Sequence, residues 1–174
     1  MEYLKADLKQ KQKIFAQDGA HVGMLRIVMA DGTSANIIYR LMRWFAVRNI
    51  TIVAYAFQWL NKFMNGCVIG IGADFDQGFV IMHPVGIVIN SKVKAGENIT
   101  IESGVVIGDE KGQSPRLANN IFIGAGAKVI GGLTVADDVK IGANAVLTKN
   151  AHKGATMLGI PAKAYVKNND GANV

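Results

Sequence analysis

Residues 123–147 read IGAGAKVIGGLTVADDVKIGANAVL, and an aliphatic residue recurs in this stretch at every sixth position. The five positions are Ile123, Val129, Val135, Ile141 and Leu147. A period of six matches neither the 3.6-residue repeat of a helix nor a simple alternation of two. It matches short strands joined by turns, in which each hexad forms one flat wall of a solenoid and three hexads complete a coil. We therefore expect a mainly β fold, a parallel β solenoid.

The same repeat extends toward the N-terminus and is interrupted twice. Its earlier first positions are Ile69, Phe75, Ile81, Ile89, Ala95, Ile101 and Ile107. A two-residue slip follows Ile81, and a longer interruption, GDEKGQSPRLANN, precedes Ile123. The dipeptides at 97–98 and 137–138 suit corners, because Asn and Asp tolerate positive φ better than most residues.

Before Cys67 the pattern becomes helical. Residues 2–17 are charged and favour a helix, residues 32–36 read as a turn with a helix start, and residues 37–48 and 51–64 carry apolar residues at helical spacing. We expect the apolar face of the helix at 51–64 to contain Val53, Phe57, Leu60 and Met64, and to be widened by Trp59 and Phe63. The predicted organisation is a helical segment at 1–64, a solenoid at 67–168 and a polar tail at 169–174.

Composition narrows the class of protein. The single cysteine, Cys67, excludes a disulfide framework and reads as a small buried hydrophobe in a cytoplasmic protein. The N-terminal residues do not resemble a secretory signal. The net charge of +6 would attract anionic partners, but the basic residues are scattered, so no nucleic-acid partner is expected. Contact of the aromatic and aliphatic helices with a membrane surface is an alternative, but packing against the solenoid or another subunit is the favoured interpretation.

The run from Gly124 to Tyr165 closely resembles the end of bacterial hexapeptide-repeat acyltransferases. The segment FVIMHPVGIVIN, followed by VKAGENITIESGVVIG, resembles the serine acetyltransferase branch and the related exopolysaccharide O-acetyltransferases. This resemblance implies a left-handed parallel β-helix, a handedness that the general right-handed crossover rule does not supply. It also implies an enzyme that uses acetyl-CoA as acyl donor and needs no metal.

His83 is the candidate catalytic residue. Of the three histidines, only His83 lies in a break of the hexad register, where a side chain can leave the stack and face a cleft. The resemblance makes it the general base that takes the proton from the acceptor hydroxyl, a role that suits imidazole near neutral pH. A turn histidine of no consequence is the alternative reading of the residue pattern.

The resemblance also implies a groove for acetyl-CoA. Gly108, Ala125 and Ala143 correspond to family positions that line the groove, and Lys163 in GIPAKAY corresponds to a basic residue near the nucleotide phosphates. Each of the three small residues has an equally simple reading as a turn residue of a coil. The long interruption resembles a loop that is extruded beside the site in this branch.

The chain departs from the serine enzymes at several positions. They have an aspartate that orients the histidine, where this chain has Val68, and a second aspartate where it has Met82. Their loop carries an arginine and a histidine where this chain has Gln113 and Ser114.

These losses favour a sugar or glycan acceptor in polysaccharide biosynthesis, with free serine as the alternative. Asp74, Asp76 and Glu102 are candidates to replace the lost orienting carboxylate.

Two further functions stay open. A zinc enzyme of the carbonic-anhydrase-like solenoid type requires three ligands, and His21 and His152 fall outside the central coils. A catalytically inactive scaffold is consistent with the missing aspartate. The resemblance implies a homotrimer with sites shared between neighbouring subunits, and leaves a hexamer open.

Overall fold

The computed structural model describes residues 2–165; the tail expected at 169–174 and the last residues of the expected solenoid segment lie outside the described residues. Four helices come first: α1 (Glu2–Gln17), α2 (Met24–Val28), α3 (Thr33–Ala46) and α4 (Thr51–Asn65). The expected helices correspond to α1, α3 and α4, whereas the short α2 was not expected. None of the helices between residues 2 and 165 is long and apolar enough to cross a membrane.

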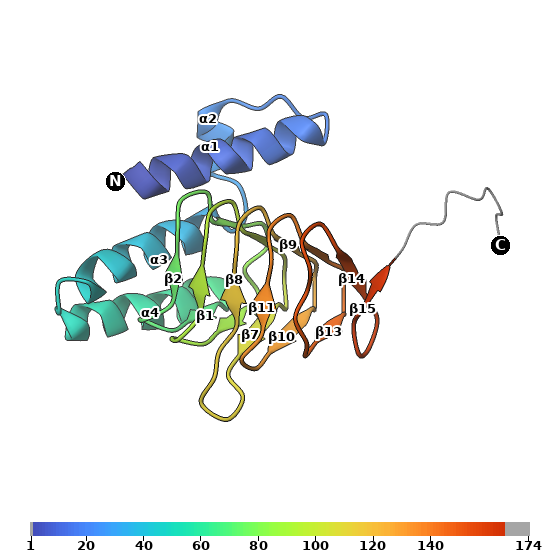
Figure 1. The fold of residues 1–174 in the computed structure, drawn as a ribbon. Helices are drawn as coiled ribbons and strands as arrows, with labels where there is room; N and C mark the ends of the chain where they lie inside the picture. Colours follow the sequence, from blue (N-terminus) through green and yellow to red (C-terminus); the bar gives the residue numbers. More distant parts are fainter. Residues whose placement is uncertain (1, 166–174) are drawn as a thin grey trace.

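A three-walled β solenoid follows (Figure 1). The first wall contains β1 (Val68–Ile69), β4 (Val88–Ile89), β7 (Val106–Gly108), β10 (Lys128–Ile130) and β13 (Val146–Leu147). The second contains β2 (Asp74–Phe75), β5 (Lys94–Ala95), β8 (Arg116–Leu117) and β11 (Thr134–Val135). The third contains β3 (Val80–Ile81), β6 (Thr100–Ile101), β9 (Phe122–Ile123), β12 (Lys140–Ile141), β14 (Thr156–Leu158) and β15 (Lys163–Tyr165). All pairings are parallel except β14 with β15.

The hexad positions form the core, as predicted. Ile69, Ile89, Ile107, Val129 and Leu147 stack along the first wall and are at most 2% exposed. Burial of large aliphatic side chains contributes about 1.5–3 kcal/mol each, so the repeat itself supplies much of the stability.

The predicted corners adopt the left-handed conformation. Asn98 has φ 57° and Asp138 has φ 62°. Asn120 lies between them, donating to Asp138 at 3.1 Å and accepting a hydrogen bond from Asn98 at 3.0 Å. Amide and carboxylate side chains therefore form a ladder along one edge of the solenoid.

The interruption of the repeat between Ile107 and Ile123 covers fewer residues than the sequence predicts. Leu117 is buried in β8 and pairs with Ala95 and Val135, so the hexad beat resumes there and not at Ile123. Only residues 109–115 leave the wall, and they form the hairpin that projects from the solenoid in Figure 1.

The predicted apolar face of α4 is wrong in part. Val53 and Phe57 are half-buried, but Leu60 and Met64 are exposed, and the fully buried face contains Ala54, Asn61 and Asn65. The sequence pattern identified the helix but not which side packs, because apolar residues surround most of it.

A buried ion pair attaches α1 and α3 to the solenoid. Arg40 donates to both carboxylate oxygens of Asp7 at 2.7 and 2.9 Å, and to the carbonyl oxygens of Phe75 and Asp76 at 2.7 Å each. Asp7 also accepts from the backbone N–H of Phe79 at 3.0 Å. Burial raises the pKa of Asp7, although Arg40 and the Phe79 amide favour its charged form. The pair joins three segments that are distant in sequence.

We expect Asp7→Ala to lower the free energy of unfolding by about 3–5 kcal/mol, because the substitution leaves the Arg40 guanidinium buried without its carboxylate. Urea denaturation measures the change. The matched control is Asp18→Ala, which removes an exposed carboxylate just after α1 and should change stability by no more than about 0.5 kcal/mol. Equal effects of the two substitutions would contradict the role given to the Asp7–Arg40 pair.

Candidate functional site

His83 lies at the edge between the third and first walls, after β3 and before β4. Its side chain is 59% exposed, and the neighbouring Pro84 is buried. The two extra residues in this corner, which appear in the sequence as a slip of the hexad register, lift the imidazole out of the stack. The structure therefore places His83 outside the core, as the break in the repeat predicted.

The carboxylate that faces His83 belongs to Asp31. Asp31 Oδ2 lies 2.8 Å from His83 Nδ1, and Asp31 Oδ1 accepts from the backbone N–H of Gly32 at 2.9 Å. Asp31 lies between α2 and α3, so the helical segment supplies the group that Val68 does not. With both oxygens bound, the carboxylate is held in one orientation relative to the imidazole.

None of the three carboxylates proposed from the sequence bonds to His83. Asp74 is on the second wall, where it pairs with Arg43 at 2.8 Å and Lys94 at 3.3 Å. Asp76 accepts from the backbone of the next residue in the corner after β2. Glu102 lies near enough to Lys11 to raise its pKa, but it forms no hydrogen bond with the imidazole.

A glycine brings Asp31 close to the end of β3. Gly32 has φ 75°, and a Cβ at this position would lie 2.2 Å from the carbonyl oxygen of Ile81. That distance is far below any tolerated contact, so only glycine allows the turn before α3 to approach the backbone two residues before His83.

Lys11 of α1 reinforces this junction. Its Nζ donates to Ile81 O at 2.9 Å and also to the carbonyl oxygen of Asp31. Burial lowers the pKa of Lys11 to about 8, while the negative charges of Asp31 and Glu102 act in the opposite direction. One ammonium group thus ties together the turn that carries Asp31 and the strand that leads to His83.

The sequence offered little indication of Asp31. The Asp31-Gly32-Thr33 run marks a turn and a helix start, but the partner imidazole is 52 residues away. Because the contact depends on how α1 and α3 pack on the third wall, no local pattern predicts it.

Two of the predicted cofactor-binding residues share an edge with His83. Gly104 donates to Val85 O at 2.9 Å, Gly126 to Ser103 O at 2.7 Å, and Asn144 to Ala125 O at 2.8 Å. These bonds stack the corners of successive coils, so that Ala125, Ala143 and the corner of His83 follow one line. With about 4.8 Å between coils, Ala125 lies roughly 10 Å and Ala143 roughly 14 Å along the edge from that corner. Ala125 is half-buried and Ala143 is exposed on this edge.

Gly108 and Lys163 lie elsewhere in the fold. Gly108 ends β7 at the opposite edge of the first wall, where its carbonyl accepts from the N–H of Gly131 at 3.1 Å. Lys163 is exposed on β15 and pairs with Leu158 at the C-terminal end of the third wall. One chain therefore brings together His83, Ala125 and Ala143 along one edge and does not bring Gly108 to them.

The extruded hairpin is at the Gly108 edge, away from His83. Lys111 and Gly112 have φ 51° and 82°, the positive values that a tight two-residue hairpin turn requires. Lys92 holds the hairpin through Asp109 at 3.4 Å and Gly112 O at 3.0 Å. Within the described chain, the hairpin makes no hydrogen bond to the His83 corner.

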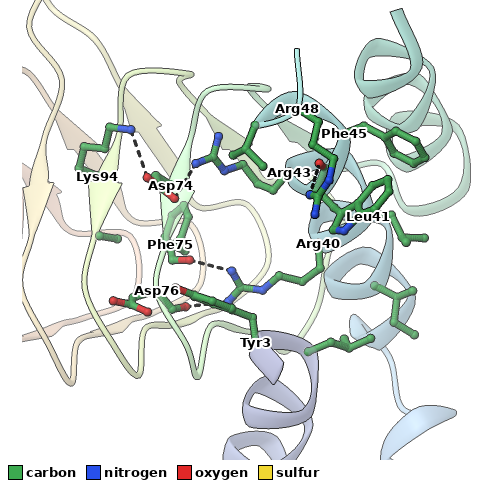
Figure 2. A pocket seen from close by; sticks show the side chains of 15 residues that line it. Tyr3, Arg40, Leu41, Arg43, Phe45, Arg48, Asp74, Phe75, Asp76 and Lys94 are labelled. Atoms are coloured by element: carbon green, nitrogen blue, oxygen red, sulfur yellow. Dashed lines mark hydrogen bonds and ion pairs between the residues drawn. The ribbon is translucent and has the colours of Figure 1, made fainter. Parts of the chain in front are cut away.

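A hollow of about 740 Å³ lies between α3 and the second wall (Figure 2). Figure 2 shows Arg43 and Lys94 converging on Asp74 above the ring of Phe75. Burial opposes the ionisation of Asp74, but Arg43 and Lys94 outweigh it and lower its pKa. These charges pair with one another, and the hollow is on a different wall from the His83 edge.

The remaining reactive side chains form no second centre. Burial raises the pKa of the Cys67 thiol to about 12, in agreement with the expected inert, buried role. Among residues 2–165, no three His, Cys, Asp or Glu side chains gather as metal ligands do.

Comparisons with known proteins match the fold and the sequence. A serine acetyltransferase from Helicobacter pylori is 38% identical over 145 residues, which span 81% of this chain and 85% of the relative. No family model matches the chain.

Solved structures agree with this match. A serine acetyltransferase of Neisseria gonorrhoeae in complex with serine has a TM-score of 0.84 and 27% identity, covering 93% of this chain and 67% of that one. A serine acetyltransferase in complex with CoA, 24% identical, has a similar fold with a TM-score of 0.86 and covers 94% and 68% of the two chains. Because the Helicobacter relative exceeds 30% identity over most of its length, the chain belongs to the serine acetyltransferase family, hexapeptide-repeat acetyltransferases with a left-handed β-helix.

Proposed function

We propose that this chain transfers an acetyl group from acetyl-CoA to the hydroxyl group of a small acceptor, with His83 as the general base. The observation that carries the proposal is the exposed imidazole held by Asp31 at 2.8 Å, on the same edge as Ala125 and Ala143. An inactive scaffold would not require this arrangement. Residues 2–165 of one chain contain no group of three His, Cys, Asp or Glu side chains that could hold a zinc ion.

The hydrogen bond between His83 and Asp31 determines which imidazole nitrogen acts as the general base. When Asp31 is ionised, Nδ1 of His83 carries the proton that it donates to Oδ2, and Nε2 is left with a free lone pair. Nε2 takes the proton of the acceptor hydroxyl as its oxygen attacks the thioester carbonyl carbon. The carbon–sulfur bond then breaks, the imidazolium returns the proton to the departing sulfur, and an acetyl ester and CoA thiol are formed.

Acetyl-CoA would follow the edge from His83 past Ala125 and Ala143. Small residues leave room for its slim pantetheine arm, and the stacked corners offer backbone donors and acceptors. Lys163 at the end of the third wall is the proposed partner of the nucleotide phosphates. The CoA complex of the structurally similar enzyme supports this choice of donor.

Serine is the acceptor that the relatives support best. The Helicobacter enzyme is named for it, and the Neisseria enzyme binds it. The residues missing relative to the serine enzymes favoured a sugar or glycan acceptor and a place in polysaccharide biosynthesis, which the serine acetyltransferase relatives do not support. A neutral polyol remains a second candidate because Met82, Gln113 and Ser114 replace charged residues that the family resemblance leads us to expect.

The site we propose is shared between subunits. One chain places its hairpin and Gly108 on the edge of the first wall opposite His83, so a neighbouring chain would have to bring its hairpin to the imidazole. Three chains packed through their first walls around a threefold axis would bring a neighbour's hairpin to every His83. We therefore propose a homotrimer, with a dimer of trimers as a larger alternative.

We expect thiol release from acetyl-CoA in the presence of serine, and a loss of about 10²–10⁴-fold in kcat for His83→Ala. A panel of serine, neutral monosaccharides and a no-acceptor control measures both. His21→Ala is the matched control, because that histidine is exposed between α1 and α2. Turnover of sugars but not serine would favour the second candidate, and an unimpaired His83→Ala variant would exclude the mechanism.

Asp31→Asn should lower kcat by about 10–10²-fold with little change in KM, because a hydrogen bond to a charged group contributes about 1.5–3 kcal/mol. Asp76→Asn, which removes an exposed carboxylate in another corner, should leave kcat unchanged. Steady-state kinetics with saturating acetyl-CoA distinguish the two variants. The role of Asp31 fails if its variant matches the wild type or if Asp76→Asn shows the loss instead.

Sedimentation velocity of the full chain should give about three times the 18.6 kDa of one chain, or about six times for paired trimers. The physical reason is that one chain separates His83 from the hairpin. An active monomer would contradict the shared site while leaving the roles of His83 and Asp31 intact.

A further inference from the structure

Helix α4 exposes the large apolar side chains that a helix normally buries. Ile52 is 86% exposed, Phe63 80% and Trp59 55%. We call the outer stripe of α4 the exposed residues spaced at three- and four-residue intervals along one side: Ile52, Tyr55, Trp59, Leu60, Phe63 and Met64. This spacing forms a continuous apolar face on the side of the helix that points away from α3.

A polar network fixes the rotation of α4. Asn61 donates to the carbonyl oxygen of Ala35 at 3.2 Å, and Asn65 donates to the side-chain oxygen of Asn61 at 2.9 Å. Ser34 of α3 donates to Asn65 Oδ1 at 2.6 Å. Rotation that buried the outer stripe would break the two bonds to α3, those with Ala35 and Ser34, at a net cost of about 0.5–1.5 kcal/mol each. The apolar face is therefore held outward by the inward-facing bonds.

The segment that contains the stripe carries charges of one sign. Residues 32–73, which include all of α3 and α4, contain no acidic residue. Arg48 lies over the ring of Trp44 at 3.9 Å, and Lys62 lies over the ring of Trp59 at 4.9 Å. Cations beside exposed aromatic rings are typical of helices that lie in a membrane interface.

We propose that the outer stripe of α4 binds the surface of an anionic lipid bilayer, with its apolar side chains in the boundary between headgroups and acyl chains. Arg40 and Arg43 are held by Asp7 and Asp74, so Arg48 and Lys62 are the cations that would meet lipid phosphates. The helix has 15 residues, about 22 Å, and lies on the surface without spanning the bilayer.

The positive charge beside the stripe favours an anionic bilayer over a second copy of the chain as its partner. A twofold contact through the stripe would bring Arg48 and Lys62 of both copies to one interface in which α3 and α4 offer no carboxylate. An anionic surface supplies the missing negative charge. The inference does not depend on the acceptor or on His83, since no residue of the stripe belongs to the proposed catalytic edge.

The test is co-sedimentation of the full chain with vesicles of phosphatidylcholine mixed with phosphatidylglycerol, and with vesicles of phosphatidylcholine alone. We expect binding to the mixed vesicles that weakens with added salt. Trp59→Ser combined with Phe63→Ser should weaken binding more than about tenfold, because two large apolar side chains leave the interface. Lys62→Glu should weaken it about fivefold or more.

Matched substitutions outside the stripe control for surface changes. Leu25→Ser removes a 76%-exposed apolar side chain from α2, and Lys140→Glu makes the same charge change on β12. Both should bind vesicles like the wild type, and all variants should retain the wild-type unfolding midpoint.

A second readout separates lipid binding from self-association. In Trp44→Phe, Trp59 is the single tryptophan, and its fluorescence should shift to shorter wavelength on addition of mixed vesicles. No shift, equal binding to both vesicle types, or a smaller sedimenting mass for the Trp59→Ser, Phe63→Ser variant would overturn the proposal. The last outcome would identify the stripe as a contact between subunits.

Discussion

Stacking of aliphatic side chains from one coil onto the next is the constraint on which the rest of the molecule depends. Each wall strand has only two or three residues, too few to be stable alone. The inward residue of every hexad meets its equivalent in the neighbouring coil, as Ile89 lies between Ile69 and Ile107. Because the spacing of coils is set by backbone hydrogen bonds, corners at equal positions also align, and any corner that departs from the pattern is displayed on an otherwise regular edge.

The helical segment turns such a displayed corner into a site. The solenoid alone presents His83 on its surface without a carboxylate, since Val68 and Met82 stand where the family resemblance leads us to expect aspartates. The turn before α3 provides Asp31, and Lys11 joins that turn to the strand before the histidine. The segment before the solenoid is therefore part of the proposed catalytic apparatus as well as a cap on its end, and changes in its packing would alter the orientation of the imidazole.

Helix α4 shows how a few polar groups decide which side of a helix is buried. It carries apolar residues around most of its circumference, so hydrophobicity alone does not choose a face. The amides of Asn61 and Asn65 select the buried face, because their bonds to Ala35 and Ser34 of α3 form only in the observed rotation. The same bonds leave Trp59 and Phe63 at the surface, which connects a packing detail to a proposed interaction with lipid.

The solenoid, its corners, the helices α1, α3 and α4 and the exposed corner of His83 could be predicted from the sequence, because each follows from a local period or from a break in one. Ala125 and Ala143 were suggested by the family resemblance, and the repeat places them on one edge because positions one coil apart are stacked. The position of Asp31 opposite His83 and the side of α4 that packs are set by tertiary packing. These depend on contacts between residues far apart in the chain, whose geometry is set by how the helices seat on the first coil, and no repeat in the sequence records that arrangement.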